Sequence, residues 1–124
     1  MRAIQPVHLH DKGAKVSNLH KGLLFLLLHQ SISDNDRETL QQRLAAELRG
    51  QTFGSVTEEL VGMFQNQLKQ RAARARSDVP DKLKEKLRNL PVSDRTGRGN
   101  GDVDELTAEG LNWLLTKLGA LEPE

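Results

Sequence analysis

The sequence contains no cysteine and no tyrosine, and it has only three phenylalanines and one tryptophan. The absence of cysteine excludes a disulfide framework, a thiol nucleophile and a thiolate metal site. The longest apolar run, residues 23–28, is far shorter than the roughly 20 residues that span a bilayer. Residues 1–7 lack the apolar stretch and small-residue cleavage site of a signal peptide. We therefore expect a soluble chain without membrane insertion, whose compartment the sequence leaves unknown.

Length and composition indicate one small helical domain. The 124 residues, of which 36% are hydrophobic, suffice for a single modest core. Leucine is abundant, with 21 residues, whereas tyrosine is absent and valine and isoleucine are few, and leucine keeps its rotamer freedom in a helix. The fold class predicted from composition is all-α.

Apolar spacing predicts the first helix and its place in the fold. Residues with helical spacing on one face are Val16, Leu19, Leu23, Leu26 and Leu27, and other sides carry Leu24, Phe25 and Leu28. A helix that is apolar on nearly all sides must be covered from several directions. The pattern therefore predicts segment 16–28 at the centre of a bundle.

Further helices follow from caps and leucine periodicity. One begins near Asp34, carries Leu40, Leu44 and Leu48 on one face, and ends at Gly50. Another begins at Ser55, whose spacing to Glu58 is that of a capping box. Its apolar face ends at Leu68, so the basic continuation is expected to run into solvent.

The second half of the chain predicts two more helices around a loop. Leu83, Leu87 and Leu90 line a short helix that Pro91 stops. The glycine-rich segment 92–101 is expected to be a flexible loop. A last helix is predicted from the N-cap Asp104 to Gly119, with Leu111, Leu114, Leu115 and Leu118 inward.

Opposite charges gather in neighbouring segments. Residues 69–98 hold ten basic and four acidic side chains, and residues 99–124 hold one basic and six acidic ones. The basic segment could neutralise the phosphates of an anionic partner. It has no aromatic residue on which a base could stack, which argues against nucleic acid and favours a solvated face.

No constellation of residues predicts catalysis, a cofactor or a metal. His8, His10 and Asp11 are of metal-ligand types, but no spacing brings His20 or His29 to them, so surface histidines are favoured. Gly97, Gly99 and Gly101 have neither dinucleotide nor P-loop spacing and are interpreted as linker. No zinc-protease pair or nucleophile elbow occurs. We predict that the chain is not an enzyme.

Trp113 is the most informative single residue. It falls opposite the inner leucines of the last helix, on a second apolar strip with Leu106 and with Gly110 between them. Either an inserted helix or the N-terminal segment covers this strip, or Trp113 is an exposed anchor for a sugar, a peptide or a neighbouring domain. Trp113 and Leu106 are thus the candidate ligand or partner contacts.

Three segments, taken in order, resemble the peptidoglycan-binding-like domain, a small three-helix bundle. The first is Val16-x-x-Leu19-x-x-x-Leu23. The second is Phe53-Gly54-x-x-Thr57-x-x-Leu60-Val61-x-x-Phe64-Gln65, and the third is Gly101-x-Val103-Asp104-x-x-Thr107-x-x-x-Leu111. The matched residues suit the helices predicted above, because Gly54 and Asp104 stand at helix starts and Phe64 lies on an apolar face that enters the core. These matches cover about half of the chain.

The resemblance implies a domain organisation with two inserts. Residues 1–12 would be an N-terminal arm, 13–121 a single domain with inserts at 32–50 and 69–100, and 122–124 the start of a linker to a further part. The Asp-Gly pair that the family has before its phenylalanine is missing ahead of Phe53. The missing pair and the two inserts lie around the turns that connect the helices. We therefore expect these departures from the family pattern to alter ligand binding more than the fold.

The resemblance implies a non-catalytic binding module. Such a module would attach a larger bacterial protein to peptidoglycan or another cell-surface glycan-peptide, as a monomer when isolated and without a cofactor. The final segment is also similar to modules near the start of very large bacterial proteins related to toxin complexes. The alternative is therefore a structural or protein-interaction domain that has kept the fold and lost the ligand.

Overall fold

A computed structural model describes residues 2–29, 34–74, 76, 78–93, 95 and 98–121, with backbone alone for 34–37. Within these ranges the chain forms helices and no strand, which confirms the all-α class. The helices are α1 (Ala14–His29), α2 (Asp34–Gly50), α3 (Ser55–Ala73), α4 (Asp81–Arg88) and α5 (Glu105–Lys117). Their order and bounds follow the predicted segments closely.

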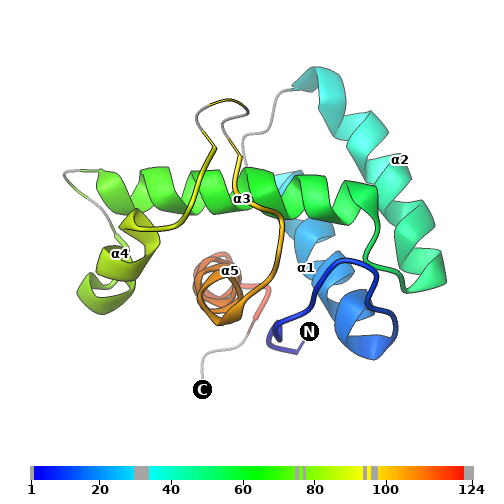
Figure 1. Ribbon diagram of the computed structural model, residues 1–124, viewed down its shortest axis with the longest axis horizontal. Coiled ribbons are helices and arrows are strands. Elements are labelled where there is room, and N and C mark those ends of the chain that lie inside the picture. The colour runs from blue at the N-terminus through cyan, green and yellow to red at the C-terminus, as the bar shows by residue number, and fades with distance from the viewer. Residues whose placement is uncertain are drawn as a thin grey trace.

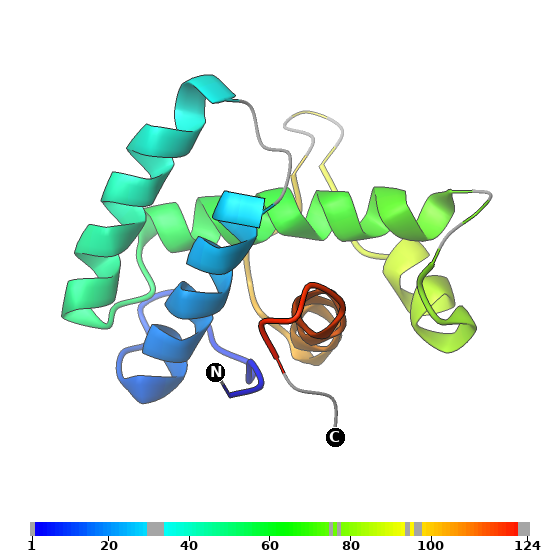
Figure 2. The same cartoon turned by 180° about the vertical axis from the view of Figure 1, so that it is seen from behind.

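Helix α3 forms the centre of the molecule. It runs horizontally across most of the molecule in Figure 1, with α1 and α2 beside one half and α4 and α5 beside the other, and Figure 2 shows the same order from behind. The prediction that segment 16–28 would be central is wrong. Leu28 remains 48% exposed, and Leu24 and Phe25 are only partly buried. A long helix can cover four neighbours along its length, whereas the apolar surface of α1 exceeds what packs against it.

Helices α2 and α4 each complete the core on one side. Helix α2 lies against α1 and α3 through Leu40 and Leu44, which are buried. Helix α4 packs on the far end of α3 and on α5 through its buried leucine stripe. Ala72 is completely buried there, so the expectation that α3 enters solvent past Leu68 is wrong. The stripe on α4 requires a partner surface, and the end of α3 provides it.

The N-terminal arm is part of the core. Ile4 and Val7 are buried, although residues 2–12 form no helix. Val7 pairs with Val103 through two backbone hydrogen bonds of 3.0 and 3.1 Å. The side chain of Asn112 accepts from the Ile4 amide at 2.7 Å and donates to the Ile4 carbonyl at 2.9 Å. The arm is therefore fixed to the start and the middle of α5.

The described part of loop 92–101, which the composition predicts to be flexible, forms backbone hydrogen bonds within the loop and with α3. The Ser93 amide donates to the Arg98 carbonyl at 2.9 Å, and the Gly99 amide donates to the Gly62 carbonyl of α3 at 2.9 Å. A Cβ atom on Gly62 would lie 3.0 Å from the Gly99 oxygen. Glycine at this point of α3 is what allows the loop backbone to approach so closely.

Candidate functional site

The residues of the second and third segments of the pattern lie on α3, on α5 and just before the two helices, and the first segment lies on α1. Most of them are buried. Gly54 is partly buried and Asp104 is exposed. The buried members of the second and third segments are Phe53, Thr57, Leu60, Val61, Phe64, Gln65, Gly101, Val103, Thr107 and Leu111. Their positions make these side chains a framework that orients helices, and they leave little surface for a ligand.

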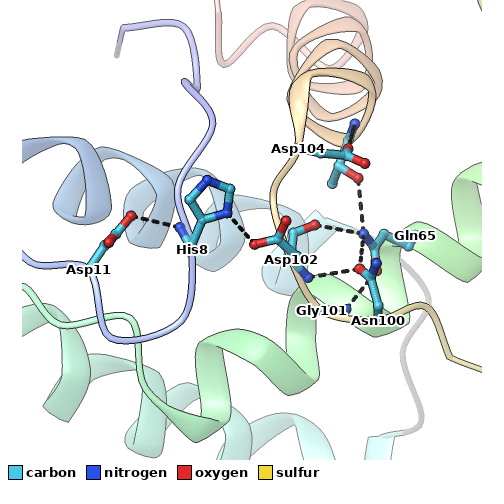
Figure 3. Close-up of polar contacts among 8 residues, drawn as sticks. His8, Asp11, Gln65, Asn100, Gly101, Asp102 and Asp104 are labelled. Atoms are coloured by element: carbon cyan, nitrogen blue, oxygen red, sulfur yellow. Dashed lines mark hydrogen bonds and ion pairs between the residues drawn. The ribbon is translucent and has the colours of Figure 1, made fainter.

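Gln65 connects α3 to the start of α5. Its amide nitrogen donates to the Thr107 hydroxyl at 2.9 Å and to the Asp102 carbonyl at 2.8 Å, and its oxygen accepts from the Gly101 amide at 2.9 Å (Figure 3). Asn100 is 3.2 Å from the same nitrogen. Because Gln65 is 3% exposed, these partners satisfy a side chain that would otherwise be costly to bury. The bonds fix loop 98–104 against α3.

Asp104 caps α5 as predicted. Its carboxylate accepts from the Thr107 amide at 2.8 Å. Gly101 has a φ of 82°, and a Cβ atom there would lie 2.4 Å from the Cγ atom of Glu58. A glycine is required at this position both by the left-handed backbone and by the close approach to α3. The other end of α5 also agrees with the prediction, since Gly119 has a φ of 85°.

Glu47 of α2 caps α3 from another helix. The N-cap of α3 is Gly54, which has no side chain with which to cap. The Glu47 carboxylate accepts from the amides of Gly54, Val56 and Thr57, each at 3.1 Å. The Thr57 hydroxyl also donates to it at 2.6 Å. One carboxylate thus satisfies several of the amides that a helix start leaves without intrahelical partners.

The predicted capping box at Ser55 is wrong. Ser55 is the first residue of α3 and is exposed, and no side chain of the N-cap residue bonds to the helix. Sequence reasoning did not identify Glu47, because it lies on the preceding helix. The available signal was the glycine at position 54, which leaves the helix start without a local acceptor. A distant carboxylate is one way to supply that acceptor.

His20 completes a buried polar network at the start of α3. Its Nε2 atom lies 2.8 Å from the Thr57 hydroxyl, and the residue is completely buried. Because a carboxylate only accepts, Thr57 donates to Glu47 and therefore accepts from Nε2–H of His20. Among the described residues, the buried Nδ1 atom has no hydrogen-bond partner. Burial lowers the pKa of His20, although the charge of Glu47 opposes this effect.

The two helix starts use the same device. At α5, buried Gln65 bonds to Thr107, whose amide is capped by Asp104. At α3, buried His20 bonds to Thr57, and Glu47 provides the carboxylate. In each case a polar side chain on an earlier helix meets a threonine in a first turn. This equivalence explains why the quoted pattern carries a threonine at the same distance from both helix starts.

The histidines of the arm are exposed, as predicted. The Nδ1 atom of His8 lies 2.5 Å from an Asp102 carboxylate oxygen, and Asp11 accepts from the His8 amide at 2.8 Å (Figure 3). The hydrogen bond and charge of Asp102 raise the pKa of His8. Within the described ranges, no three histidine, aspartate or glutamate side chains are arranged to hold a metal ion. His10 does not join the pair between His8 and Asp102.

An open groove of about 450 Å³ lies between α3 and the loop beside it. Glu59 on its wall is 3.3 Å from both Arg43 and Arg98, so its charge is compensated. The lining residues are Ser55, Glu58, Glu59, Gly62, Arg98, Gly99 and Asn100. The groove is polar, and it contains neither Trp113 nor Leu106.

Trp113 and Leu106 are half-buried against the core. The strip between them is covered at Gly110, where a Cβ atom would lie 3.0 Å from Leu68 and 3.1 Å from Leu87. The C-terminal end of α3 and helix α4 therefore cover part of the strip. Trp113 keeps a partly accessible indole, with the guanidinium carbon of Arg71 5.8 Å from the ring centroid. The strip is therefore covered in part, and Trp113 remains half-buried.

Comparison with known proteins found no matching family model, curated protein or solved structure. Over the part of the chain that the structure describes, no helix combines the length and apolar character needed to cross a membrane.

Proposed function

We propose that the chain is a non-catalytic binding module that attaches a larger bacterial protein to peptidoglycan or another cell-surface glycan-peptide. In this proposal α1, α3 and α5 are the three-helix peptidoglycan-binding-like bundle, and α2 and α4 are its elaborations. The observation that carries the proposal is the matched pair of polar helix starts. Residues on which the resemblance is based form hydrogen bonds at these two helix starts. Chance matches scattered over a helical chain would not be expected to lie in such equivalent places.

The candidate contact surface is the half-buried strip at Trp113 and Leu106. A partly exposed tryptophan supplies a large apolar area and little conformational entropy loss, which makes it a frequent anchor in recognition. The framework residues Thr57, Gln65 and Thr107 have their hydrogen-bonding groups occupied within the protein. Ligand contact is therefore assigned to the strip and away from the framework.

The alternative is a structural or protein-interaction domain that has lost the ligand. It is favoured by the way α4 and the end of α3 cover Gly110, because this narrows the surface around Trp113. This alternative predicts no retention on cell walls and a stable interface with another part of the parent protein. Co-expression with that part would detect the interface.

Retention of the purified chain on peptidoglycan sacculi tests the proposal. The expected result is retention at low salt, with roughly thirtyfold weaker retention for Trp113→Ala, since an aromatic anchor is commonly worth about 2 kcal/mol and each 1.4 kcal/mol is tenfold. Phe25→Ala is the matched control, because Phe25 is the partly buried aromatic residue of α1, and it should be retained like the parent chain. No retention of the parent chain would remove the wall-binding proposal and leave the interaction domain.

A further inference from the structure

The polar groove between α3 and loop 98–104 contains one carboxylate that the described protein leaves without a partner. Glu58 and Glu59 both line the groove. Glu59 lies 3.3 Å from Arg43 and from Arg98, which neutralise it. Among the described residues, no hydrogen bond or ion pair reaches the carboxylate of Glu58, although this residue is partly buried. A partly desolvated carboxylate in this situation is available to a cation from outside the protein.

The stem of Glu58 is held against the loop on the opposite wall. At Gly101, which has a φ of 82°, a Cβ atom would lie 2.4 Å from the Cγ atom of Glu58, so glycine is what allows this close packing. The Gly101 amide in turn donates to the buried Gln65 side chain at 2.9 Å (Figure 3). The packed stem and the anchored loop restrict the rotamers of Glu58. Its side chain therefore loses little conformational entropy when a ligand binds.

The groove is open to solvent and has room for a side chain of a partner. Its volume of about 450 Å³ lies within the roughly 300–1,000 Å³ of known ligand sites, and Gly62 and Gly99 on its lining have no side chains to fill it. Ser55 adds an exposed hydroxyl with no hydrogen-bond partner among the described residues. The lining holds two carboxylates and one guanidinium, so it attracts positive charge more than negative charge.

A primary ammonium group matches these features. It is a compact charge with three N–H donors, so it can bond to the Glu58 carboxylate and keep donors for a hydroxyl such as that of Ser55 and for water. A metal ion fits less well, because no three histidine, aspartate or glutamate side chains in the described ranges are arranged to hold one. The lysine side chain presents an ammonium on a stem that can extend into an open groove.

We propose that the groove binds the ammonium group of a lysine side chain on a peptide, with Glu58 as its counter-ion and Ser55 as a second acceptor. This inference goes beyond the proposed function, because the groove lies apart from the strip at Trp113 and Leu106 and recognises a cation whether or not the peptide belongs to a cell wall. It also gives a reason why one acid of the groove is neutralised by two arginines while the acid beside it is left accessible.

Titration with acetyl-lysine methylamide tests the site, with NMR signals of the backbone amides as the readout. Gly62 and Gly99 line the groove and should report binding, whereas Gly119 lies outside it and serves as the reference. Acetyl-norleucine methylamide is titrated in parallel, because it has the same stem without the ammonium. We expect saturable shifts with the lysine compound alone, at a Kd of roughly 1 mM that rises with added salt. Equal responses to the two compounds, or no response to either, would overturn the proposal.

Glu58→Gln separates binding from folding. Glutamine keeps the shape of the side chain and removes its charge, so the affinity for the lysine compound should fall roughly fivefold or more. Glu105→Gln is the matched control, since Glu105 is an exposed acid in the first turn of α5 and lies outside the groove. Each substitution removes a negative charge from a helix start, so the two midpoints of thermal unfolding should fall by similar small amounts.

Two outcomes of this comparison contradict the site. A lower midpoint for Glu58→Gln with unchanged binding would give Glu58 a structural role alone, and an equal loss of binding in Glu105→Gln would indicate general charge attraction. The sacculus assay reports separately from the titration. Retention without a response to the lysine compound contradicts only the groove site, and a response without retention contradicts only wall binding.

Discussion

Thr57 and Thr107 occupy equivalent places in the first turns of α3 and α5, and they receive their carboxylates from different sources. Asp104 is the N-cap residue of its own helix, whereas Glu47 reaches the start of α3 from α2. Gly54 makes the second arrangement feasible, since a Cβ atom there would lie 2.7 Å from the Glu47 carboxyl group. The start of α3 therefore depends on a residue of the preceding helix.

Glu47→Ala should destabilise the fold by about 2 to 3 kcal/mol, because it leaves amides at the start of α3 and the Thr57 hydroxyl without their acceptor. The free energy of unfolding in urea measures this loss. Glu38→Ala removes an exposed acid from the same helix and should change it little.

A second substitution makes this test more specific. Gly54→Asp alone should destabilise the chain, since its side chain collides with Glu47. Combined with Glu47→Ala it should recover stability, because the extended backbone at Gly54 suits an aspartate N-cap like Asp104. Additive losses in the double variant would contradict the capping role of Glu47.

His20 should make the stability of the fold sensitive to acid. Its pKa is lowered from 6.5 by burial, so the folded state binds this proton less readily than the unfolded state. Its stabilising contribution is fully present above pH 6.5 and is lost as the pH falls through 6.5 towards the folded-state pKa. Unfolding free energies measured across this range should decrease towards acid.

His20→Gln should reduce that acid sensitivity. Glutamine can donate to the Thr57 hydroxyl as Gln65 does to Thr107, and it does not titrate. His8 acts in the opposite direction, because its raised pKa stabilises the fold below pH 6.5 and the effect is lost as the pH rises through the folded-state value. Its exposure keeps this term small. An unchanged slope in His20→Gln would show that another group causes the acid sensitivity.

At the level of elements, the sequence predicts well where the helices lie along the chain, and it predicts poorly which helices pack against one another. Leucine periodicity locates α4 and α5, and the N-cap Asp104 marks the start of α5, since both signals are local. The burial of Ala72 depends on the return of α4 onto α3, which no local pattern contains. The capping of α3 by Glu47 could not be predicted for the same reason, because Glu47 lies on another helix. Among candidate contacts, Trp113 is located by its spacing on α5, but its cationic neighbour Arg71 is revealed only by tertiary packing.

In the whole molecule, the charged segments and the arm join regions that are distant in sequence. Lys86 of basic α4 lies 3.7 Å from Glu109 of acidic α5, so the opposite charges of the second half lie side by side. The arm contacts both helix starts, with the His10 amide donating to the Phe53 carbonyl at 2.9 Å and Val7 paired with Val103. These contacts predict one cooperative unit.

Ile4→Ala tests this unity. Ile4 is 3% exposed, and its truncation should lower the free energy of unfolding by about 2 to 5 kcal/mol, because a cavity replaces buried methyl groups. Gln5→Ala is the neighbouring control, and its exposed side chain should contribute little. Helix content by circular dichroism and Trp113 fluorescence should report coincident urea transitions in both variants. Separate transitions, or an unchanged midpoint for Ile4→Ala, would mean that the arm is an appendage to the fold and that the helices hold together without it.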